Sequence, residues 1–528
     1  MPTGSNIHQG RTMNTSTEPW IPIVWGDGQP GTASLCEAFG RGEDIRDLAV
    51  RPHERIALMR LLICVAQAAL DGPADHDDWK TSRPKIAPAA LEYLKRWHDA
   101  FELFGERQRF LQVPGLKKPA GKDDREEGNS VSKLDLALAT GNNSTLFDNG
   151  GGSEREFSAP RLALLALAFQ CFSPGGRIGV ASWDNTITPG DGSSDHAPCI
   201  AGSMLHAVVR GDNLIDTISR NLMTKDQVAE FFGQSSWGHP VWEQMPSKSS
   251  DKPAVQNATQ TYLGRLVPLS RAIRLENDGR SFIVANGLDY PPYPEWREPT
   301  ATIVTRKIKE QPKRVTLRSS AEKAAWRELH ALAVIAVDKN TNGGPAALRN
   351  VADAAAFDLW VGGLAASKAK LVDTIESVFH VPAAMLGETS QRAYEQGVRW
   401  AESAGFRLGR AVSVYHRELG DNLDRAEFRD RRQQIQNKAT AHYWTDIEEA
   451  VPRLLHVAAN PGKLGPSAEW HRTDWGKAVR ASMHTAYEHA SPHGTPRQMR
   501  AYALGLSTLH FKPAKQADST NGEKESEA

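Results

Sequence analysis

The sequence predicts an α+β protein, in which an irregular mixed α/β N-terminal domain is followed by an all-α C-terminal four-helix bundle. Helical and strand patterns alternate in the first part of the chain, whereas strand patterns stop at about Val381 and four helical patterns follow. The 528 residues also exceed the usual size of one domain. We therefore predict an N-terminal domain over 18–380 and a bundle over 381–511, flanked by disordered segments at 1–17 and 512–528.

In the N-terminal domain, apolar residues with helical spacing alternate with short β-branched runs. Helices are expected at ERIALMRLLICVAQAAL (54–70) and APRLALLALAFQCF (159–172). Strands are expected at WIPIVW (20–25), RSFIVANGL (280–288) and TATIVTRKI (300–308). Long loops rich in Gly, Asn, Pro and Ser separate these elements, so the domain is expected to be irregular.

The C-terminal region is expected to form an up-and-down bundle. Short turns containing Gly, Pro or Asn separate four helical patterns, which cover about 383–419, 423–458, 467–491 and 495–510. In the second pattern, apolar residues recur at multiples of four and share one face: Ile435, Tyr443, Ile447, Val451 and Leu455. We assign this face to the core of the bundle.

The overall composition is that of an ordinary soluble, cytoplasmic protein. The chain has 63 basic and 63 acidic residues and a pI near 7.3, which argues against a protein that coats nucleic acid over its whole surface. Its apolar runs are shorter than the roughly 20 residues of a membrane span. The four cysteines lie far apart without a CxxC pair, so neither a metal clip nor a disulfide framework is indicated.

The search for catalytic motifs favours a protein that is not an enzyme. The sequence contains neither a GxxxxGK phosphate loop nor a nucleophile elbow, and PGGRIG lacks the preceding strand of a dinucleotide fingerprint. The alternative is a metal-dependent phosphohydrolase or nuclease that uses DHDDW (75–79), although this stretch is expected to lie in a polar loop. His484, His489 and His493 are spaced more like a frayed helix end than like metal ligands.

Two kinds of segment stand out as candidate binding elements. RKIKEQPKRVTLR (306–318) has six basic residues and one acid, without an aromatic residue, which suits phosphates better than stacked bases. A solvated hairpin explains the same pattern equally well. The others are glycine-rich loops, GNNSTLFDNGGGSE (141–154) and FQCFSPGGRIG (169–179), where the chain can approach a ligand closely.

Several motifs, taken in order, resemble the CasA family, the large subunits of type I-E CRISPR Cascade complexes. They are EPWIPI with the helix after it, FLQVPGLK, the loop around Phe147, SPGGRIG, ANGLDYPPYPEWREPTATIVTRK, LWVGGLAASKAK and HYWTDIEEAVPRLL. The resemblance covers about residues 18 to 511.

The resemblance implies a DNA-reading subunit of an RNA-guided antiviral complex. In such complexes the guide RNA pairs with the target, while protein reads the short adjacent motif (PAM) in the duplex. The expected partners are double-stranded target DNA, crRNA, the backbone, small and crRNA-end subunits, and a helicase-nuclease recruited in trans after the R-loop forms. Neither a cofactor nor a membrane is expected.

The resemblance also implies site residues. The family's glycine loop lies against the PAM minor groove and matches Gly175, Gly176 and Gly179. Arg177 departs from the family pattern and is expected to reach a phosphate or the narrow groove. Because glycine has no Cβ, the backbone can approach base edges in a groove only about 6 Å wide.

Five further residues match family positions. Phe147 and Asn149 match the loop near the crRNA end and the PAM, and Lys307 matches a basic residue near the duplex. Arg280 stands where the family has a lysine finger, six residues before Asn-Gly-Leu. Lys368 stands near the family's amide wedge, and because lysine departs from that pattern, the identity of the wedge stays open. Some relatives carry a cysteine-rich zinc clip before the finger; residues 270–289 of this chain contain no cysteine, which predicts no zinc.

Overall fold

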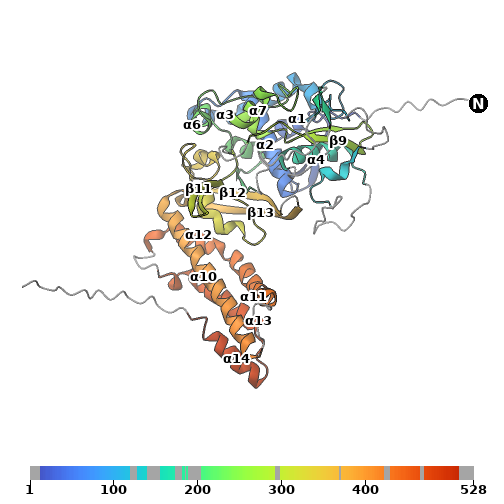
Figure 1. The fold of residues 1–528 in the computed structure, drawn as a ribbon. Coiled ribbons are helices and arrows are strands. Elements are labelled where there is room, and N and C mark those ends of the chain that lie inside the picture. Colours follow the sequence, from blue (N-terminus) through green and yellow to red (C-terminus); the bar gives the residue numbers. More distant parts are fainter. Residues whose placement is uncertain are drawn as a thin grey trace, which may run out of the picture. The chain divides into compact units, whose positions relative to one another are not determined.

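In a computed structural model, the chain divides into two compact units between Gln391 and Arg392 (Figure 1). The structure describes residues 12–118, 128–138, 155–172, 181–184, 186–187, 204–291, 298–367, 370–420, 429–463 and 469–510. The first unit contains helices and strands, and the described part of the second is helical. The predicted fold class, mixed α/β followed by helices, is confirmed. Our sequence boundary at residue 380 lies close to the end of the last strand.

The strands of the first unit form small antiparallel sheets. They are β1 (Ile21–Trp25), β2 (Pro30–Ala33), β3 (Ile45–Leu48), β4 (Asn129–Ser130), β5 (Ser182–Trp183), β6 (Thr186–Ile187), β7 (His206–Arg210), β8 (Arg271–Leu275), β9 (Ser281–Asn286), β10 (Ile303–Ile308), β11 (Gln311–Thr316), β12 (Ala356–Ser367) and β13 (Lys370–Pro382). Their orders are β2-β1-β3, β4-β9-β8, β13-β12-β7, β10-β11 and β5-β6. The three predicted strands correspond to β1, β9 and β10.

Helices occupy much of both units. Those of the first unit are α1 (Leu35–Gly40), α2 (Pro52–Leu70), α3 (His76–Arg96), α4 (Ala159–Phe172), α5 (Leu214–Arg220), α6 (Lys225–Phe232), α7 (Lys252–Gln260), α8 (Tyr262–Leu266) and α9 (Leu329–Leu332). Those that follow are α10 (Glu388–Glu418), α11 (Arg429–Glu449), α12 (Val451–Ala459), α13 (Asp474–Ala490) and α14 (Pro496–Leu506). None of the described helices is long and apolar enough to cross a membrane.

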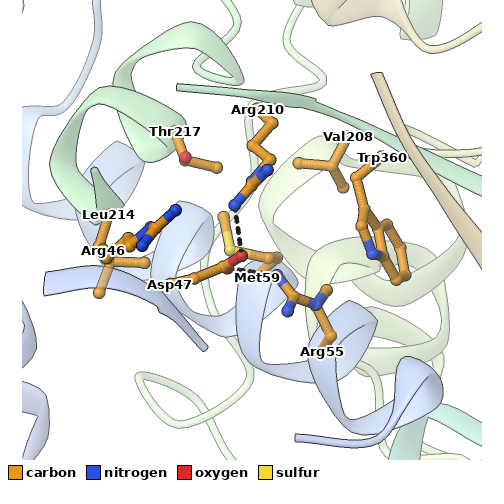
Figure 2. A pocket seen from close by; sticks show the side chains of 9 residues that line it. All are labelled: Arg46, Asp47, Arg55, Met59, Val208, Arg210, Leu214, Thr217 and Trp360. Carbon is orange, nitrogen blue, oxygen red and sulfur yellow. Dashed lines mark hydrogen bonds and ion pairs between the residues drawn. The ribbon is translucent and has the colours of Figure 1, made fainter. Parts of the chain in front are cut away.

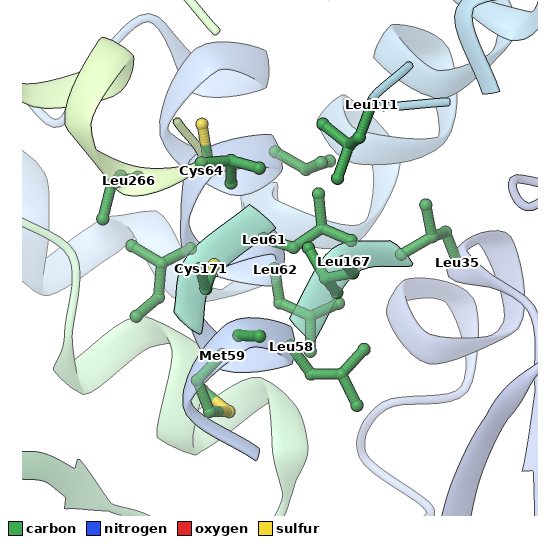
Figure 3. Close-up of a cluster of buried hydrophobic side chains, with 14 of the residues drawn as sticks. Leu35, Leu58, Met59, Leu61, Leu62, Cys64, Leu111, Leu167, Cys171 and Leu266 are labelled. Carbon is green, nitrogen blue, oxygen red and sulfur yellow. The ribbon is translucent and has the colours of Figure 1, made fainter. Parts of the chain in front are cut away.

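The core of the first unit is built around α2 and α4. Both helices are apolar on nearly every face, which is the pattern of a helix buried on all sides. Figure 3 shows Leu61 and Leu62 of α2 beside Leu167 and Cys171 of α4, all fully or almost fully buried. Both helices were predicted from their sequence patterns.

The folded part of the chain begins at a lower residue number than the predicted start at residue 18. We assigned residues 1–17 to a disordered terminus, but Met13 and Thr15 are buried. Thr15 donates hydrogen bonds from its N and Oγ1 to the carbonyl of Phe101, both 2.9 Å long. Trp20 Nε1 donates to the carbonyl of Thr15 at 2.7 Å. Polar composition misled the prediction for this stretch, because its backbone and hydroxyl groups pair inside the fold.

The helical unit keeps the predicted apolar face, but the second predicted helix is interrupted. Tyr443, Ile447 and Val451 are buried, as predicted. The predicted helix over 423–458 is instead described as α11 and α12, which meet at Ala450. Pro452 lies in the first turn of α12, where its missing N–H costs no hydrogen bond.

Candidate nucleic-acid interface

The basic segment forms the predicted hairpin from β10 and β11. Its register pairs Arg306 with Lys313 and Lys307 with Pro312, and the two-residue turn is Lys309-Glu310. Both turn residues have positive φ, 49° and 65°, as a type I′ turn requires. The strands therefore project as a tight ribbon that is exposed from position 305 to 314.

The basic residues are distributed over both faces of this ribbon. Because side chains alternate along a strand, Arg306 and Lys313 point to one face, and Lys307 and Arg314 point to the other. Arg314 donates to the carbonyls of Lys339 (2.9 Å) and Thr341 (2.8 Å), so it holds the neighbouring loop in place.

Three lysines at the end of the ribbon remain available to a ligand. Lys307, Lys309 and Lys313 are exposed and make neither an ion pair nor a side-chain hydrogen bond with any described residue. Exposed, unpaired lysines on a narrow ribbon can form ion pairs with the phosphates of a polyanion such as DNA. The segment is the exposed hairpin that was the alternative explanation of the charge pattern, and its geometry is also compatible with phosphate contacts, so the phosphate role stays a prediction.

A buried ionic network fixes the chain that leads into the hairpin. Glu298, fully buried, accepts from Arg60 Nη2 of α2 at 3.0 Å and from Arg265 Nη2 of α8 at 2.7 Å. Arg60 also donates to Thr300 Oγ1 at 3.1 Å. Both arginines have no exposed side-chain surface, so the carboxylate is required to compensate two buried cations. The network thus ties two core helices to the segment just before β10.

His206, the first residue of β7, contacts the same segment. Its Nδ1 lies 2.8 Å from Thr300 Oγ1, and its Cα is paired with Gly362 of β12. Its ring packs edge to face on Phe172, with the centroids 5.7 Å apart. Phe172 is the last residue of α4 and directly precedes the predicted glycine loop. One fully buried residue therefore contacts three segments that the sequence analysis singled out, two through its side chain and one through its backbone.

Arg280 lies in the turn between β8 and β9, at the surface. Its side chain is 67% exposed, and its Nη2 lies 2.6 Å from Glu156 Oε1, which is 63% exposed. Its carbonyl accepts from the N–H of Val131 at 3.1 Å, and its own N–H donates to Asp278. An exposed pair of this kind contributes at most about 1 kcal/mol, so a stronger anion can displace Glu156.

The Gly362-Gly363 pair lies in the middle of β12, where the backbone packs closely. A Cβ on Gly363 would lie 2.8 Å from the carbonyl oxygen of Met204, and a Cβ on Gly362 would overlap the Trp360 ring. The pair is therefore required for packing within the fold. β12 ends at Ser367.

The structure describes two of the nine predicted contact residues, Arg280 and Lys307. The following seven lie outside the described residues and stay predictions from the sequence: Phe147, Asn149, Gly175, Gly176, Arg177, Gly179 and Lys368. The structure places Arg280 in the turn before β9 and Lys307 on β10, so these two belong to different hairpins.

A second group of arginines surrounds a cavity of only about 20 Å³ (Figure 2). Asp47 Oδ2 lies 2.8 Å from Arg210 Nη2, and the same carboxylate pairs with Arg55. Arg55 also lies 3.3 Å from Glu376. The cavity has room for about one water, and carboxylates already pair with these two arginines, so it does not suit a nucleotide.

The DHDDW stretch begins a helix, which corrects the expectation of a polar loop. Asp75 is the N-cap of α3 and accepts from the N–H groups of Asp77 and Asp78. Asp78 pairs with Lys85 at 3.0 Å. Asp75 thus caps the helix, and the acids of the first turn interact favourably with the helix dipole, as acidic residues commonly do at helix N-termini. The alternative function therefore has no assembled metal site in the described chain.

Two of the three C-terminal histidines pack on different aromatic partners. The ring of His489 stacks on His442 with the centroids 5.8 Å apart, and His493 packs on Tyr502 at 4.5 Å. Among the residues that the structure describes, no group of three or more His, Cys, Asp or Glu side chains is placed to hold a metal ion.

The chain matches a known family over most of its length. A family model described as CRISPR-associated protein Cse1 (CRISPR_cse1) matches residues 14–486. This chain belongs to the Cse1 family. The match confirms the family predicted from the ordered motifs, since CasA and Cse1 are two names of one relative. That relative, CRISPR-associated protein CasA/Cse1 of Thermus thermophilus, is 27% identical over 477 residues, covering 84% of this chain and 87% of the Thermus protein.

Solved Cse1 structures share the fold. Cse1 from Acidimicrobium ferrooxidans superimposes with a TM-score of 0.71 at 18% identity, covering 94% of this chain and 97% of that one. A chain from a CRISPR RNA-guided surveillance complex gives a TM-score of 0.69 at 17% identity, with 94% and 99% covered. At these identities the structures establish the Cse1 fold for this chain.

Sequence reasoning missed three residues that position the candidate interface: Glu298, Thr300 and His206. The first two lie in the WREPT motif (296–300), which resembles the family but suggested no role for these residues. The positions of Glu298 and Thr300 just before a predicted strand do not indicate that arginines of α2 and α8 contact this segment. His206 carried no pattern at all, because its role depends on tertiary contacts.

Proposed function

We propose that this Cse1 chain is the non-catalytic DNA-binding large subunit of a type I-E Cascade complex in antiviral defence. It recognises the PAM in double-stranded target DNA, promotes strand separation and R-loop formation, and recruits the helicase-nuclease. The observation that carries the proposal is the exposed ribbon of β10 and β11, with lysines available on both faces, in a chain of this family.

A subunit with this role needs no catalytic group. Pairing with the guide RNA supplies sequence specificity, while the protein reads a short motif and contacts the backbone. Such contacts require cations at the surface and a backbone that approaches a groove. The ribbon supplies the cations, and capping and ion pairs occupy the acids that were candidates for hydrolysis.

The ribbon is proposed to hold the duplex before the PAM is read. Lys307 would contact phosphates, and so would Lys313 on the opposite face. Phosphate contacts of this kind are independent of sequence and release counterions, so binding weakens as salt rises. Arg280 would then exchange Glu156 for a phosphate or a base edge.

The PAM itself is proposed to meet the glycine loop. Gly175, Gly176 and Gly179 would let the backbone approach the minor groove, with Arg177 reaching a phosphate or the narrow groove. This part rests on the sequence motif and on α4, which ends at Phe172 immediately before the loop and is anchored in the core.

Three further residues complete the proposed DNA site. Phe147 and Asn149 would contact the region of the crRNA end and the PAM. Lys368, which follows β12, is the candidate wedge, although its charge departs from the family's amide.

The proposed partners follow from the same role. They are crRNA, the backbone, small and crRNA-end Cascade subunits, target DNA and the helicase-nuclease, all in the cytoplasm. The charged outer faces of the helical unit are assigned to other subunits and to the displaced strand.

Reconstitution with and without this subunit tests the proposal. Cascade is mixed with duplexes that carry one matched target beside randomised flanking bases, and the bound fraction is sequenced. Enrichment of particular flanking bases only when the subunit is present is expected. Equal enrichment without the subunit would assign PAM reading elsewhere, and divalent-ion-dependent cleavage by the purified chain would favour the hydrolase instead.

A further inference from the structure

A cavity of about 290 Å³ lies beside the base of the basic ribbon. Its walls come from β10, from the segment 318–328 that follows β11, and from β13. Its polar and charged lining residues are Arg306, Arg318, Ser319, Ser320, Lys323 and Glu328. The space is sufficient for several waters or for one phosphate group with its ester oxygens.

Cations outnumber acids in this cavity. Arg306, Arg318 and Lys323 face one carboxylate, that of Glu328, which is 13% exposed. Lys323 Nζ lies 2.5 Å and Arg306 Nη2 3.5 Å from the same Glu328 Oε1. Arg318 makes no ion pair with any described residue. A single carboxylate oxygen thus holds two of the three cations.

The cavity wall is fixed by backbone and side-chain hydrogen bonds. The N–H of Leu205 donates to the carbonyl of Leu317, and the N–H of Leu317 donates to the carbonyl of Thr302, both at 2.8 Å. Ser319 Oγ donates to the carbonyl of Leu364 at 2.5 Å. The backbone that carries Arg318 is therefore already fixed before a ligand enters, which lowers the conformational-entropy cost of binding.

We propose that this cavity is a binding site for a DNA backbone phosphate, and that Glu328 is an internal competitor for it. The proposal rests on the proposed function. The Glu328 carboxylate pairs with Arg306 and Lys323 as a phosphate would. A non-specific duplex must therefore displace this carboxylate before its phosphates can contact the two cations. The effect of Glu328 is to restrain PAM-independent binding while leaving Arg318 available.

The chemistry favours a phosphate over other ligands. Guanidinium and ammonium groups together recognise phosphate oxygens, and the hydroxyl of Ser320 adds a donor. Arg306 belongs both to the cavity lining and to the ribbon, where it lies opposite Lys313 on the same face. A duplex that contacts Lys313 therefore lies beside the cavity. Free inorganic phosphate offers the same chemistry, and the experiment separates the two sources.

The test compares Glu328→Gln, Arg318→Ala and a charge-matched control, Glu322→Gln. Glu322 lies exposed in the same segment and is not among the cavity residues. Cascade reconstituted with each variant is titrated with a duplex of about 30 base pairs that lacks the PAM, from about 50 to 200 mM salt. Glu328→Gln is expected to tighten binding and to steepen the log-log salt slope by about 0.9 to 1.8, for one or two new phosphate contacts. Arg318→Ala should flatten the slope by about 0.9.

Several outcomes overturn the proposal. If Glu328→Gln behaves like Glu322→Gln and Arg318→Ala leaves the slope unchanged, DNA does not use the cavity. If inorganic phosphate at constant ionic strength raises the melting temperature of the isolated chain, while the duplex slopes of all three variants match wild type, the site serves a free anion. Both results leave the proposed function intact, because that function is tested separately, by omitting the subunit and measuring whether PAM-dependent binding is lost. Arg318→Ala breaks no described ion pair, so it provides a test even if Glu328→Gln disturbs folding.

Discussion

Neutralising the two lysines on opposite faces of the ribbon tests how the duplex is held. Lys307 and Lys313 are exposed, and the register of β10 and β11 places them on different faces. A two-stranded ribbon fits the major groove, which is about 12 Å wide, so phosphates on both sides are within reach. We therefore expect Lys307→Gln and Lys313→Gln each to remove one phosphate contact.

The expected magnitude follows from counterion release. Each lost contact flattens the log-log salt slope by about 0.9, and the double variant by about 1.8. Between about 50 and 200 mM salt, the affinity gap between wild type and the double variant should therefore narrow about twelvefold. The effect should be the same for duplexes with and without the PAM, because phosphates carry no sequence information.

The assay is equilibrium binding of reconstituted Cascade, and Lys95→Gln is the control. Lys95 is exposed on α3, outside the ribbon, and its substitution removes the same charge as each single variant. A double variant with the slope of the Lys95 control would refute the phosphate role. An effect of only one single variant would refute the two-sided geometry.

Three other predictions concern stability and the finger position. Ile447→Ala should destabilise the helical unit by about 2 to 5 kcal/mol in urea unfolding without changing PAM preference, because Ile447 is fully buried; an unchanged unfolding midpoint would contradict its place in the core. Arg280→Ala should weaken PAM-dependent binding by about 1 to 3 kcal/mol. Its melting temperature should stay the same, because the pair with Glu156 is exposed. Burial lowers the pKa of His53 to about 4 in the folded chain. In the unfolded chain the imidazole has its ordinary pKa of 6.5, so between these two pH values the unfolded chain binds a proton that the folded chain does not bind. Stability should therefore fall by about 2 kcal/mol from about pH 7 to pH 5, and less so in His53→Gln, as urea midpoints at the two pH values would show.

Patterns that depend on near neighbours predicted the fold well. Apolar periodicity identified α2 and α4, and alternation with β-branched residues identified β9 and β10. The charge run at 306–318 was compatible with a hairpin, but it gave no register, and the register decides that Lys307 and Lys313 lie on opposite faces.

Contacts between distant segments limited the prediction of the site. Glu298 owes its role to arginines of α2 and α8, and His206 owes its role to Phe172 and Thr300. Segment 13–16 was misjudged for the same reason, since its polar groups pair with residues far along the chain. Composition and spacing record none of these pairings.

The glycine loop gives the most direct test of PAM reading by this chain. If Gly176 lies against the minor-groove floor, a bulky β-branched side chain must push the duplex away or distort the loop. The measurement is equilibrium binding of Cascade with Gly176→Val to matched duplexes with and without the PAM at fixed salt. Gly462→Val is the control, because the space around Gly462 is open. We predict that Gly176→Val abolishes PAM discrimination while crRNA and subunit contents stay normal; full discrimination by this variant would contradict the account.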